Sequence, residues 1–214
     1  MVETTETTSV VKRSATGKSQ RTRERILDAA AAVLSRKGYA GTRLNDVAEL
    51  AEIASPAIYY YFPSRDDLIE EVLWTGVSQV RNNVEESLGR LRPDVQPLER
   101  IMVAIEAHLQ FELQLSEYTT ASVRNTGQVP EHLRQRALVE EIAYMHLWRS
   151  LFEAAQNEGQ LRGDIDLSVA RLVVIGALNA AAGWWNPGTR SLADLVETTQ
   201  KLVLSGLGVN AESH

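Results

Sequence analysis

Apolar side chains recur every three to four residues along most of the chain. This spacing places one apolar stripe on an α-helix, whereas a half-buried strand needs an apolar side chain at every second position. No segment of the 214 residues keeps a two-residue alternation over any length. The pattern therefore predicts an all-α protein.

The first part of the chain contains one longer helix followed by two short ones. An apolar helical stripe occupies residues 21–37, and Gly38 then supplies a natural C-cap. The second short helix begins at Ser55 and Pro56, where serine can cap a helix and proline suits the first turn. Only residues 52–54 separate the two short helices. A short helix, a three-residue turn and a second helix are typical of a helix-turn-helix.

Longer helices are expected in the rest of the chain. The expected helices cover residues 68–88, 98–115 and 130–157, then one that ends near residue 186 and one that begins at Ser191. Asp166 or Ser168 is expected to cap the penultimate helix. The helix at 130–157 carries apolar residues on more than one face, as a helix central to a bundle does.

Charge is distributed unevenly along the chain, whose net charge is −6. Residues 1–65 hold 10 Lys and Arg against 7 Asp and Glu, while the remainder holds 12 against 21. A phosphate backbone is therefore attracted to one end only. A basic tail beside a solvated helix face would give the same asymmetry, so charge alone does not establish a nucleic-acid partner.

Several function classes are disfavoured by composition. The chain has no cysteine, which excludes disulfides and thiolate metal clusters and fits a cytoplasmic location. The opening segment lacks the apolar region of a signal peptide. The apolar stretch at 172–185 is interrupted by glycine and asparagine and falls short of the roughly 20 residues that span a bilayer, so no membrane partner is expected. No catalytic motif, metal set or cofactor motif is found, so neither an enzyme nor a cofactor is expected.

The stretch that starts at Arg23 and ends in AIYYYFPSRDDLI resembles the DNA-binding domain of the tetracycline-repressor (TetR) family over about a fifth of the chain. It departs from the family pattern at three positions. Glu52 stands where the turn usually has glycine, Ala54 replaces a usual Ser or Thr, and Tyr61 replaces a common histidine. Glutamate at the turn is expected to cost stability, because a left-handed conformation suits glycine better.

The resemblance implies a recognition helix from Ser55 to Phe62, whose first turn enters the major groove of operator DNA. The residues placed on DNA are Ser55, Pro56 and Ala57 against bases, Tyr59, Tyr61 and Arg65 against phosphates, and Thr42, Arg43 and Asn45 at the start of the preceding helix. Three adjacent tyrosines could instead pack a small domain. Ile58 and Phe62, four residues apart, are expected in the core, and Tyr60 is a further candidate for it.

A small-molecule effector site is expected in the later helices, where a mostly apolar wall carries a few polar anchors. The candidate lining residues are Trp74, His108, Phe111, Arg124, Tyr144, Trp148 and Asn179. Ordinary core packing is the alternative for each of them. For His108 that alternative is a hydrogen-bonded core histidine, and for Arg124 it is a solvated salt bridge.

Small and apolar residues on the last two helices predict a homodimer seam, since small residues let another helix approach closely. The seam residues are Leu172, Val173, Gly176, Ala177, Ala180, Leu195 and Leu202. An internal core pair is the alternative, but in the TetR family this position is the dimerisation site. The end of the chain also resembles family members that respond to acyl-CoA thioesters in fatty-acid and steroid catabolism.

These expectations divide the chain into three parts. A disordered arm covers residues 1–17, a helix-turn-helix DNA-binding domain covers 18–66, and a helical-bundle domain for ligand binding and dimerisation covers 67–209. The predicted function is a repressor that a small, largely apolar effector releases from a palindromic operator. An enzyme built on a helical bundle and an architectural DNA binder without an effector are the alternatives; the first lacks the Glu-x-x-His pairs of a di-iron site.

Overall fold

The computed structural model describes residues 6–115, 118, 120–121, 125 and 127–209, with the backbone alone for residues 6–16 and 114–115. The helices are α1 (Glu6–Gly41), α2 (Leu44–Leu50), α3 (Ser55–Tyr61), α4 (Arg65–Gly89), α5 (Pro97–Gln110), the π-helix η1 (Phe111–Leu115), the 3₁₀ helix η2 (Glu131–Arg134), α7 (Gln135–Asn157), α8 (Leu167–Trp184) and α9 (Leu192–Leu207). Within the described residues no strand occurs, only an isolated bridge between Leu161 and Gly208. The all-α prediction is confirmed.

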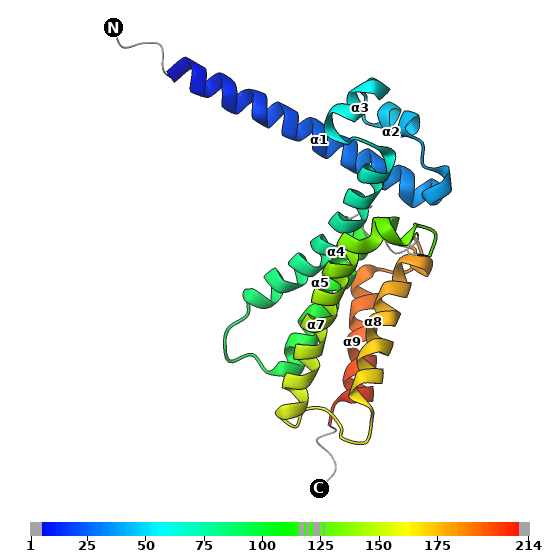
Figure 1. Ribbon diagram of the computed structural model, residues 1–214. Helices are drawn as coiled ribbons and strands as arrows, with labels where there is room; N and C mark the ends of the chain where they lie inside the picture. The colour runs from blue at the N-terminus through cyan, green and yellow to red at the C-terminus, as the bar shows by residue number, and fades with distance from the viewer. Residues whose placement is uncertain (1–5, 116–117, 119, 122–124, 126, 210–214) are drawn as a thin grey trace.

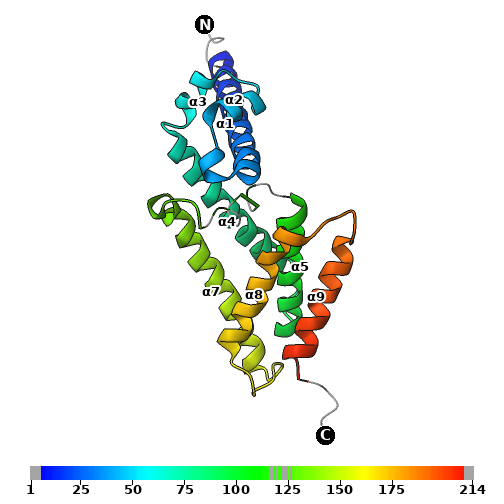
Figure 2. The ribbon, with the colours of Figure 1, turned by 90° about the vertical axis from the view of Figure 1, so that its right-hand side faces the viewer.

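The helices form a small head on a larger bundle (Figure 1). The head consists of α2 and α3 packed on α1. The helix α4 leaves the head and runs into the bundle, where α5, α7, α8 and α9 lie lengthwise (Figures 1 and 2). The helix-turn-helix therefore projects at one end of the molecule.

The first helix differs from the sequence expectation at both ends. It begins at Glu6, so residues 6–17, expected as a disordered arm, lie within α1. This stretch contains no proline, so no residue in it blocks continuation of the helix. At the other end Gly38 has φ 71° and ψ 176°, a conformation open to glycine, and kinks the helix before its final turn. The predicted C-cap glycine thus bends the chain towards α2.

Two apolar cores share α4 between them. The first core joins the head to the beginning of α4, from Leu68 to Val77, and also includes Leu133 and Ala137 from the later helices. The second core begins at Val80 and fills the bundle. Because α4 runs unbroken through both, the packing divides within α4 and not at residue 66, where the sequence analysis places the domain boundary.

Side-chain caps fix the starts of the late helices. Asp166 accepts hydrogen bonds from the backbone N–H groups of Ser168 and Val169, and the Ser191 hydroxyl accepts one from Asp194. Asp166, rather than Ser168, is therefore the cap of α8. The prediction that Ser55 caps its helix is wrong, because α3 already begins at that residue.

Candidate functional site

The turn between α2 and α3 is built around a left-handed residue. Glu52 has φ 54° and is the one described non-glycine residue with a positive φ. The turn is closed by backbone hydrogen bonds from Glu52 N–H to the Glu49 carbonyl (3.1 Å) and from Ile53 N–H to the Ala48 carbonyl (3.0 Å). The predicted left-handed conformation is confirmed, and the strain it places on glutamate falls at the joint that orients α3.

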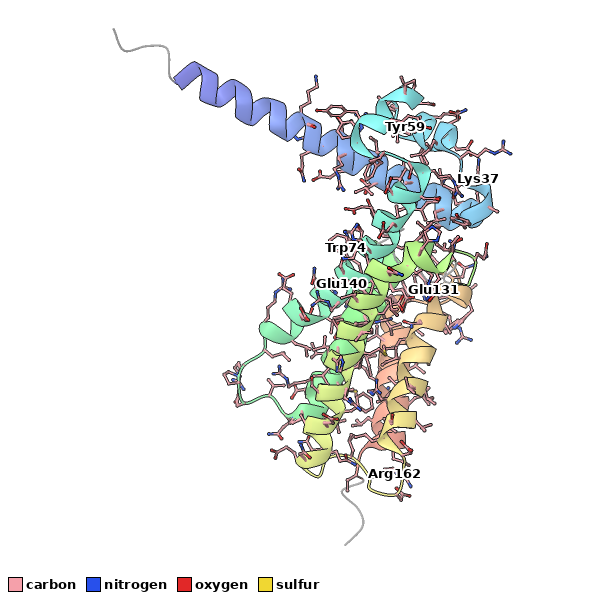
Figure 3. All side chains as sticks on the ribbon, in the orientation of Figure 1. Lys37, Tyr59, Trp74, Glu131, Glu140 and Arg162 are labelled. Atoms are coloured by element: carbon pink, nitrogen blue, oxygen red, sulfur yellow. The ribbon has the colours of Figure 1, made fainter. Side chains whose placement is uncertain are left out.

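Most of the predicted DNA-contacting side chains gather on the exposed tip of the head. Arg43 and Asn45 are exposed at the start of α2, and Pro56 and Ala57 are exposed in the first turn of α3. Tyr59 follows on α3 at the end of the molecule opposite Arg162 (Figure 3). These side chains are available to a partner outside the chain.

The three tyrosines of α3 are arranged differently from the prediction. Tyr60 is 81% exposed, whereas Tyr61 is half-buried and packs against the first core. Ile58 and Phe62 are buried as expected. Because residues advance by about 100° in a helix, Tyr60 lies opposite the Ile58 face and Tyr61 lies beside it. A helical projection from Ile58 would have identified Tyr60 as an outward residue.

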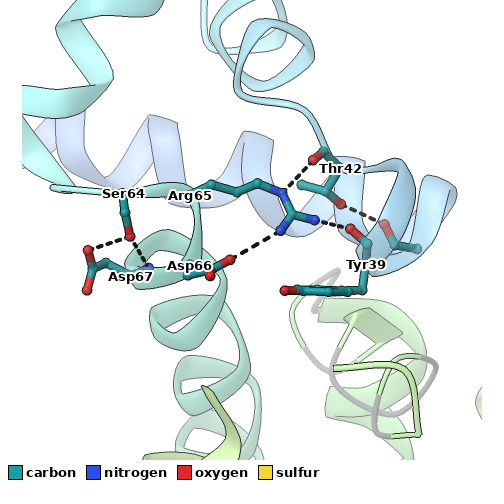
Figure 4. Close-up of polar contacts among 7 residues, drawn as sticks. Tyr39, Thr42, Ser64, Arg65, Asp66 and Asp67 are labelled. Carbon is teal, nitrogen blue, oxygen red and sulfur yellow. Dashed lines mark hydrogen bonds and ion pairs between the residues drawn. The ribbon is translucent and has the colours of Figure 1, made fainter. Parts of the chain in front are cut away.

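Two other predicted DNA contacts are used inside the head. The Thr42 side chain is buried, and its hydroxyl donates to the Gly38 carbonyl at 2.8 Å. Arg65 donates from Nε to the Thr42 carbonyl at 2.8 Å and from Nη2 to the Tyr39 carbonyl, and it contacts Asp66 at 3.2 Å (Figure 4). Its guanidinium also stacks over the Tyr39 ring, 4.4 Å from the centroid. Arg65 therefore joins α4 to the end of α1 and does not present a free cation to a phosphate.

The same end of α1 is held from the later part of the chain by Asn125. Its buried side-chain oxygen accepts from the Tyr39 N–H at 2.8 Å, and its amide donates to the Leu34 and Ala121 carbonyls at 3.2 and 2.8 Å. Arg65 and Asn125 thus both hydrogen-bond the backbone of Tyr39, the first at its carbonyl and the second at its N–H group. These contacts join the end of α1 to the later part of the chain.

An ion-pair bridge connects the head to α7. Glu71 on α4 contacts Arg23 of α1 at 2.7 Å and Arg136 of α7 at 2.8 Å. Burial of Glu71 raises the pKa of its carboxyl group, but hydrogen bonds and charge from the two arginines outweigh this and lower the pKa overall. The bridge therefore keeps a carboxylate between two cations at the neck of the molecule.

Four of the predicted ligand residues come together in the second core. His108, Tyr144 and Trp148 are buried, with the His108 and Trp148 rings 6.5 Å apart, and Phe111 packs against the same core half-buried. His108 Nδ1 lies 2.7 Å from the Tyr144 hydroxyl. Sequence reasoning missed Glu112, which lies 2.7 Å from His108 Nε2. The His108–Glu112 spacing of four residues on one helix face could have identified it.

The other three predicted ligand residues do not join this group. Trp74 is half-buried at the neck, covered by the Arg136 guanidinium 4.8 Å above its ring. Asn179 is exposed on α8, next in sequence to the buried Leu178. Arg124 lies outside the described residues. Within the part of the chain that the structure describes, no group of three His, Asp or Glu side chains is placed to hold a metal ion.

The predicted seam residues lie on an uncovered apolar surface of α8 and α9. Leu172, Val173 and Leu202 are 54%, 64% and 69% exposed. A groove of about 520 Å³ lies between the two helices, lined mainly by apolar side chains that include Val173, Ala177, Leu195 and Leu202. Exposed apolar surfaces of this kind usually mark a contact with another molecule.

The helix α8 is long and apolar enough to cross a membrane by length and composition, and only 22% of it is buried within this chain. The glycines and the asparagine that interrupt its apolar stretch do not break the helix. The sequence argument that this stretch is too short to span a bilayer is therefore not decisive.

Two family models match the chain. The model described as bacterial regulatory proteins, tetR family, matches residues 26–72, and the model described as tetracyclin repressor-like, C-terminal domain, matches residues 94–207. The second match alone covers more than half of the chain. The first match lies in the head and the start of α4, the second lies in the bundle, and residues 73–89 of α4 belong to neither.

Similar proteins span nearly the whole chain. The HTH-type transcriptional repressor KstR2 of Rhodococcus jostii is 26% identical over 197 residues, which cover 89% of this chain and 93% of the relative. The solved structure of AibR with isovaleryl coenzyme A and operator DNA has a TM-score of 0.76 at 16% identity, covering 85% of this chain and 97% of that one. FadR of Bacillus subtilis, solved with stearoyl-CoA, has a TM-score of 0.71 at 20% identity, covering 86% and 98%.

Proposed function

Because the chain belongs to the TetR family of bacterial regulatory proteins, we propose that it is a cytoplasmic homodimeric repressor that leaves its operator when a largely apolar effector binds. It acts by binding and not by catalysis. The observation that carries the proposal is the exposed tip of the head, where polar and aromatic side chains of α2 and α3 stand outside the core. A recognition helix needs such a surface.

The DNA-binding surface comprises Arg43, Asn45, Ser55, Pro56, Ala57 and Tyr59. Tyr60 is included as well, because its side chain is exposed. The first turn of α3 contacts base edges, while Arg43 and the tyrosines contact phosphates. Thr42, Tyr61 and Arg65 support this surface from within the head. The base-contacting side chains are small, so much of the affinity comes from the phosphate contacts.

The dimer forms across the exposed faces of α8 and α9. Two copies of this surface related by a two-fold axis would bury the groove between the helices and the exposed leucines and valines beside it. The two heads then contact a palindrome together, which raises affinity well above that of one head. Formation of this interface also buries the apolar side chains that α8 exposes to solvent.

The effector is an acyl-CoA thioester. AibR and FadR, which share this fold, were each solved with an acyl-CoA. The second core supplies an apolar wall around Trp148 and Phe111, with His108 and Tyr144 as polar groups, and the acyl group binds there. An effector that lowers operator affinity a hundredfold must favour the non-binding conformation by about 2.7 kcal/mol. A buried acyl chain easily provides this difference.

The proposal is tested by selecting bound DNA from the source genome and measuring its affinity by fluorescence anisotropy. Affinity is expected to fall by about a thousandfold between 50 and 200 mM salt, as for about six phosphate contacts. Acyl-CoAs of two to eighteen carbons are then added to the complex, with free CoA as the matched control. Release by an acyl-CoA but not by free CoA supports the proposal. An operator affinity that does not change with salt contradicts the proposed DNA contacts. An operator complex that no acyl-CoA dissociates contradicts the proposed effector.

A further inference from the structure

A buried polar cluster lies at the centre of the bundle. His108 of α5 is 2% exposed and connects two neighbours, with Nδ1 2.7 Å from the Tyr144 hydroxyl of α7 and Nε2 2.7 Å from Oε2 of Glu112. The Glu112 side chain is fully buried. The indole of Trp148 lies against the rings of both His108 and Tyr144, with centroids 6.5 and 6.1 Å away.

Two polar atoms of the cluster have unused hydrogen-bonding capacity within the described residues. The second carboxyl oxygen of Glu112, Oε1, is buried and has no hydrogen-bond partner among the described residues. The indole N–H of Trp148 is buried beside the Tyr144 hydroxyl, and it forms no hydrogen bond of normal geometry with the described residues. The one ion pair that the described residues give Glu112 is with His108. An acceptor and a donor left without partners in an apolar core cost free energy, so native proteins seldom keep them without a purpose.

The surroundings favour an apolar occupant with a single polar group. Leu109, Leu151 and Phe152 belong to the same core as the cluster. Glu112 also lies in η1, where the regular α5 helix gives way to a π-helix, a feature that often marks functional sites. A molecule that enters here must match one free acceptor and one free donor within an otherwise apolar environment.

We propose that Glu112 and Trp148 are the polar anchor of the effector site and that they recognise an alcohol hydroxyl on an otherwise apolar molecule. The hydroxyl donates to Glu112 Oε1 and accepts from the Trp148 indole N–H, and it is the smallest group that supplies both. The inference rests on the proposed function, because the occupant is the effector. It implies that a plain saturated chain fits less well than a hydroxylated one, since the plain chain leaves Glu112 Oε1 unpartnered.

The test uses a matched pair of probes that contain no CoA, 1-octanol and its methyl ether, on the full-length protein. The ether keeps the chain and an acceptor oxygen but has no O–H donor. The indole N–H resonances of the tryptophans are followed by NMR, and the spectrum of Trp148→Phe assigns the Trp148 signal. We expect 1-octanol to shift that signal and to bind at least about tenfold more tightly than the ether.

Variants at Glu112 separate the anchor from mere packing. Glu112→Gln keeps an acceptor oxygen and is expected to retain the preference for the alcohol, whereas Glu112→Leu is expected to abolish it. Glu106→Leu, on the exposed side of α5, is the matched control and should change nothing. If Glu112→Leu does not fold, the wild type and Glu112→Gln still decide the question through the alcohol-to-ether ratio.

Three results overturn the inference. They are equal affinity for the alcohol and the ether in the wild type, no shift of the Trp148 signal with either probe, and an undiminished preference in a folded Glu112→Leu variant. Release of operator by acyl-CoAs is measured separately. Equal binding of the two probes alongside intact acyl-CoA release rejects the anchor alone, and the reverse combination rejects the effector class alone.

Discussion

The head and the bundle differ in how completely each satisfies its own polar and apolar groups. In the head, the buried hydroxyl of Thr42 and the partly buried guanidinium of Arg65 both have backbone partners. In the bundle, atoms of Glu112, Trp148 and Trp185 are buried without partners among the described residues, and apolar side chains of α8 and α9 are exposed. Within the described residues, the head therefore satisfies its buried polar groups internally, while the bundle leaves polar atoms unpartnered and an apolar surface exposed.

The largest expected effect comes from preventing the bundle from acquiring its partner chain. Ala177→Glu places a charge in the groove between α8 and α9, where a second copy would have to bury it. The variant is expected to be monomeric and to bind operator about a thousandfold more weakly, because the second half-site no longer contributes. Sedimentation velocity and fluorescence anisotropy measure the two quantities.

The matched control for this variant is Ala154→Glu, which adds the same charge at an exposed position of α7. It should remain dimeric and keep its affinity. A dimeric Ala177→Glu protein would show that the two copies do not meet at the groove between α8 and α9.

Arg65 tests whether the head depends on its internal bonds. Arg65→Ala removes two hydrogen bonds to the carbonyls of Tyr39 and Thr42, and it is expected to lower the free energy of unfolding by about 2–3 kcal/mol. Arg43→Ala, at an exposed position, should leave stability unchanged and weaken operator binding. Urea denaturation and anisotropy distinguish the two variants. An Arg65→Ala variant as stable as Arg43→Ala would contradict the internal role of Arg65.

Tyr60 gives a smaller effect that concerns the surface of the head alone. Tyr60→Ala is expected to weaken operator binding about tenfold, or about 1.4 kcal/mol, without a change in melting temperature, because the side chain is 81% exposed. Tyr61→Ala should lower the melting temperature instead, because Tyr61 packs on the first core. The prediction fails if the two variants exchange these phenotypes.

The head could be predicted from sequence more completely than the bundle, for a physical reason. Its short helices bury one narrow face each, so the spacing of Ile58 and Phe62 determines which side of α3 faces inward. The same spacing places Tyr60 outward and Tyr61 inward, whereas the sequence analysis places Tyr61 on a phosphate and keeps Tyr60 as a candidate for the core. Arg65 could not be predicted, because its partners are backbone carbonyls that carry no sequence signal.

In the bundle, apolar stripes predicted the helices but not what each stripe packs against. The apolar residues on α7 were expected to be buried on more than one face. The Trp148 face is buried, but Leu138 and Ile142 are 46% and 51% exposed. Trp74 and Asn179 likewise lie away from the core that holds Trp148. Amphipathic periodicity reports that a face is apolar, and only the tertiary arrangement decides whether this chain or another molecule covers it.

The smallest expected effect concerns the turn of the head, where Glu52 is the one described residue with a side chain and a positive φ. Glu52 has φ 54°, a left-handed conformation that costs a residue with a side chain about 1–2 kcal/mol. Glu52→Gly removes this cost but adds the entropy that glycine loses on folding, about 0.5–1 kcal/mol. The expected result is a net gain of about 0.5–1 kcal/mol in the free energy of unfolding, measured by urea denaturation.

Glu49→Gly is the matched control, because Glu49 is exposed within α2, where glycine is expected to destabilise by about 1 kcal/mol. Opposite signs for two substitutions three residues apart would locate the strain in the turn, whereas a loss of stability in both would show that the head holds Glu52 without strain.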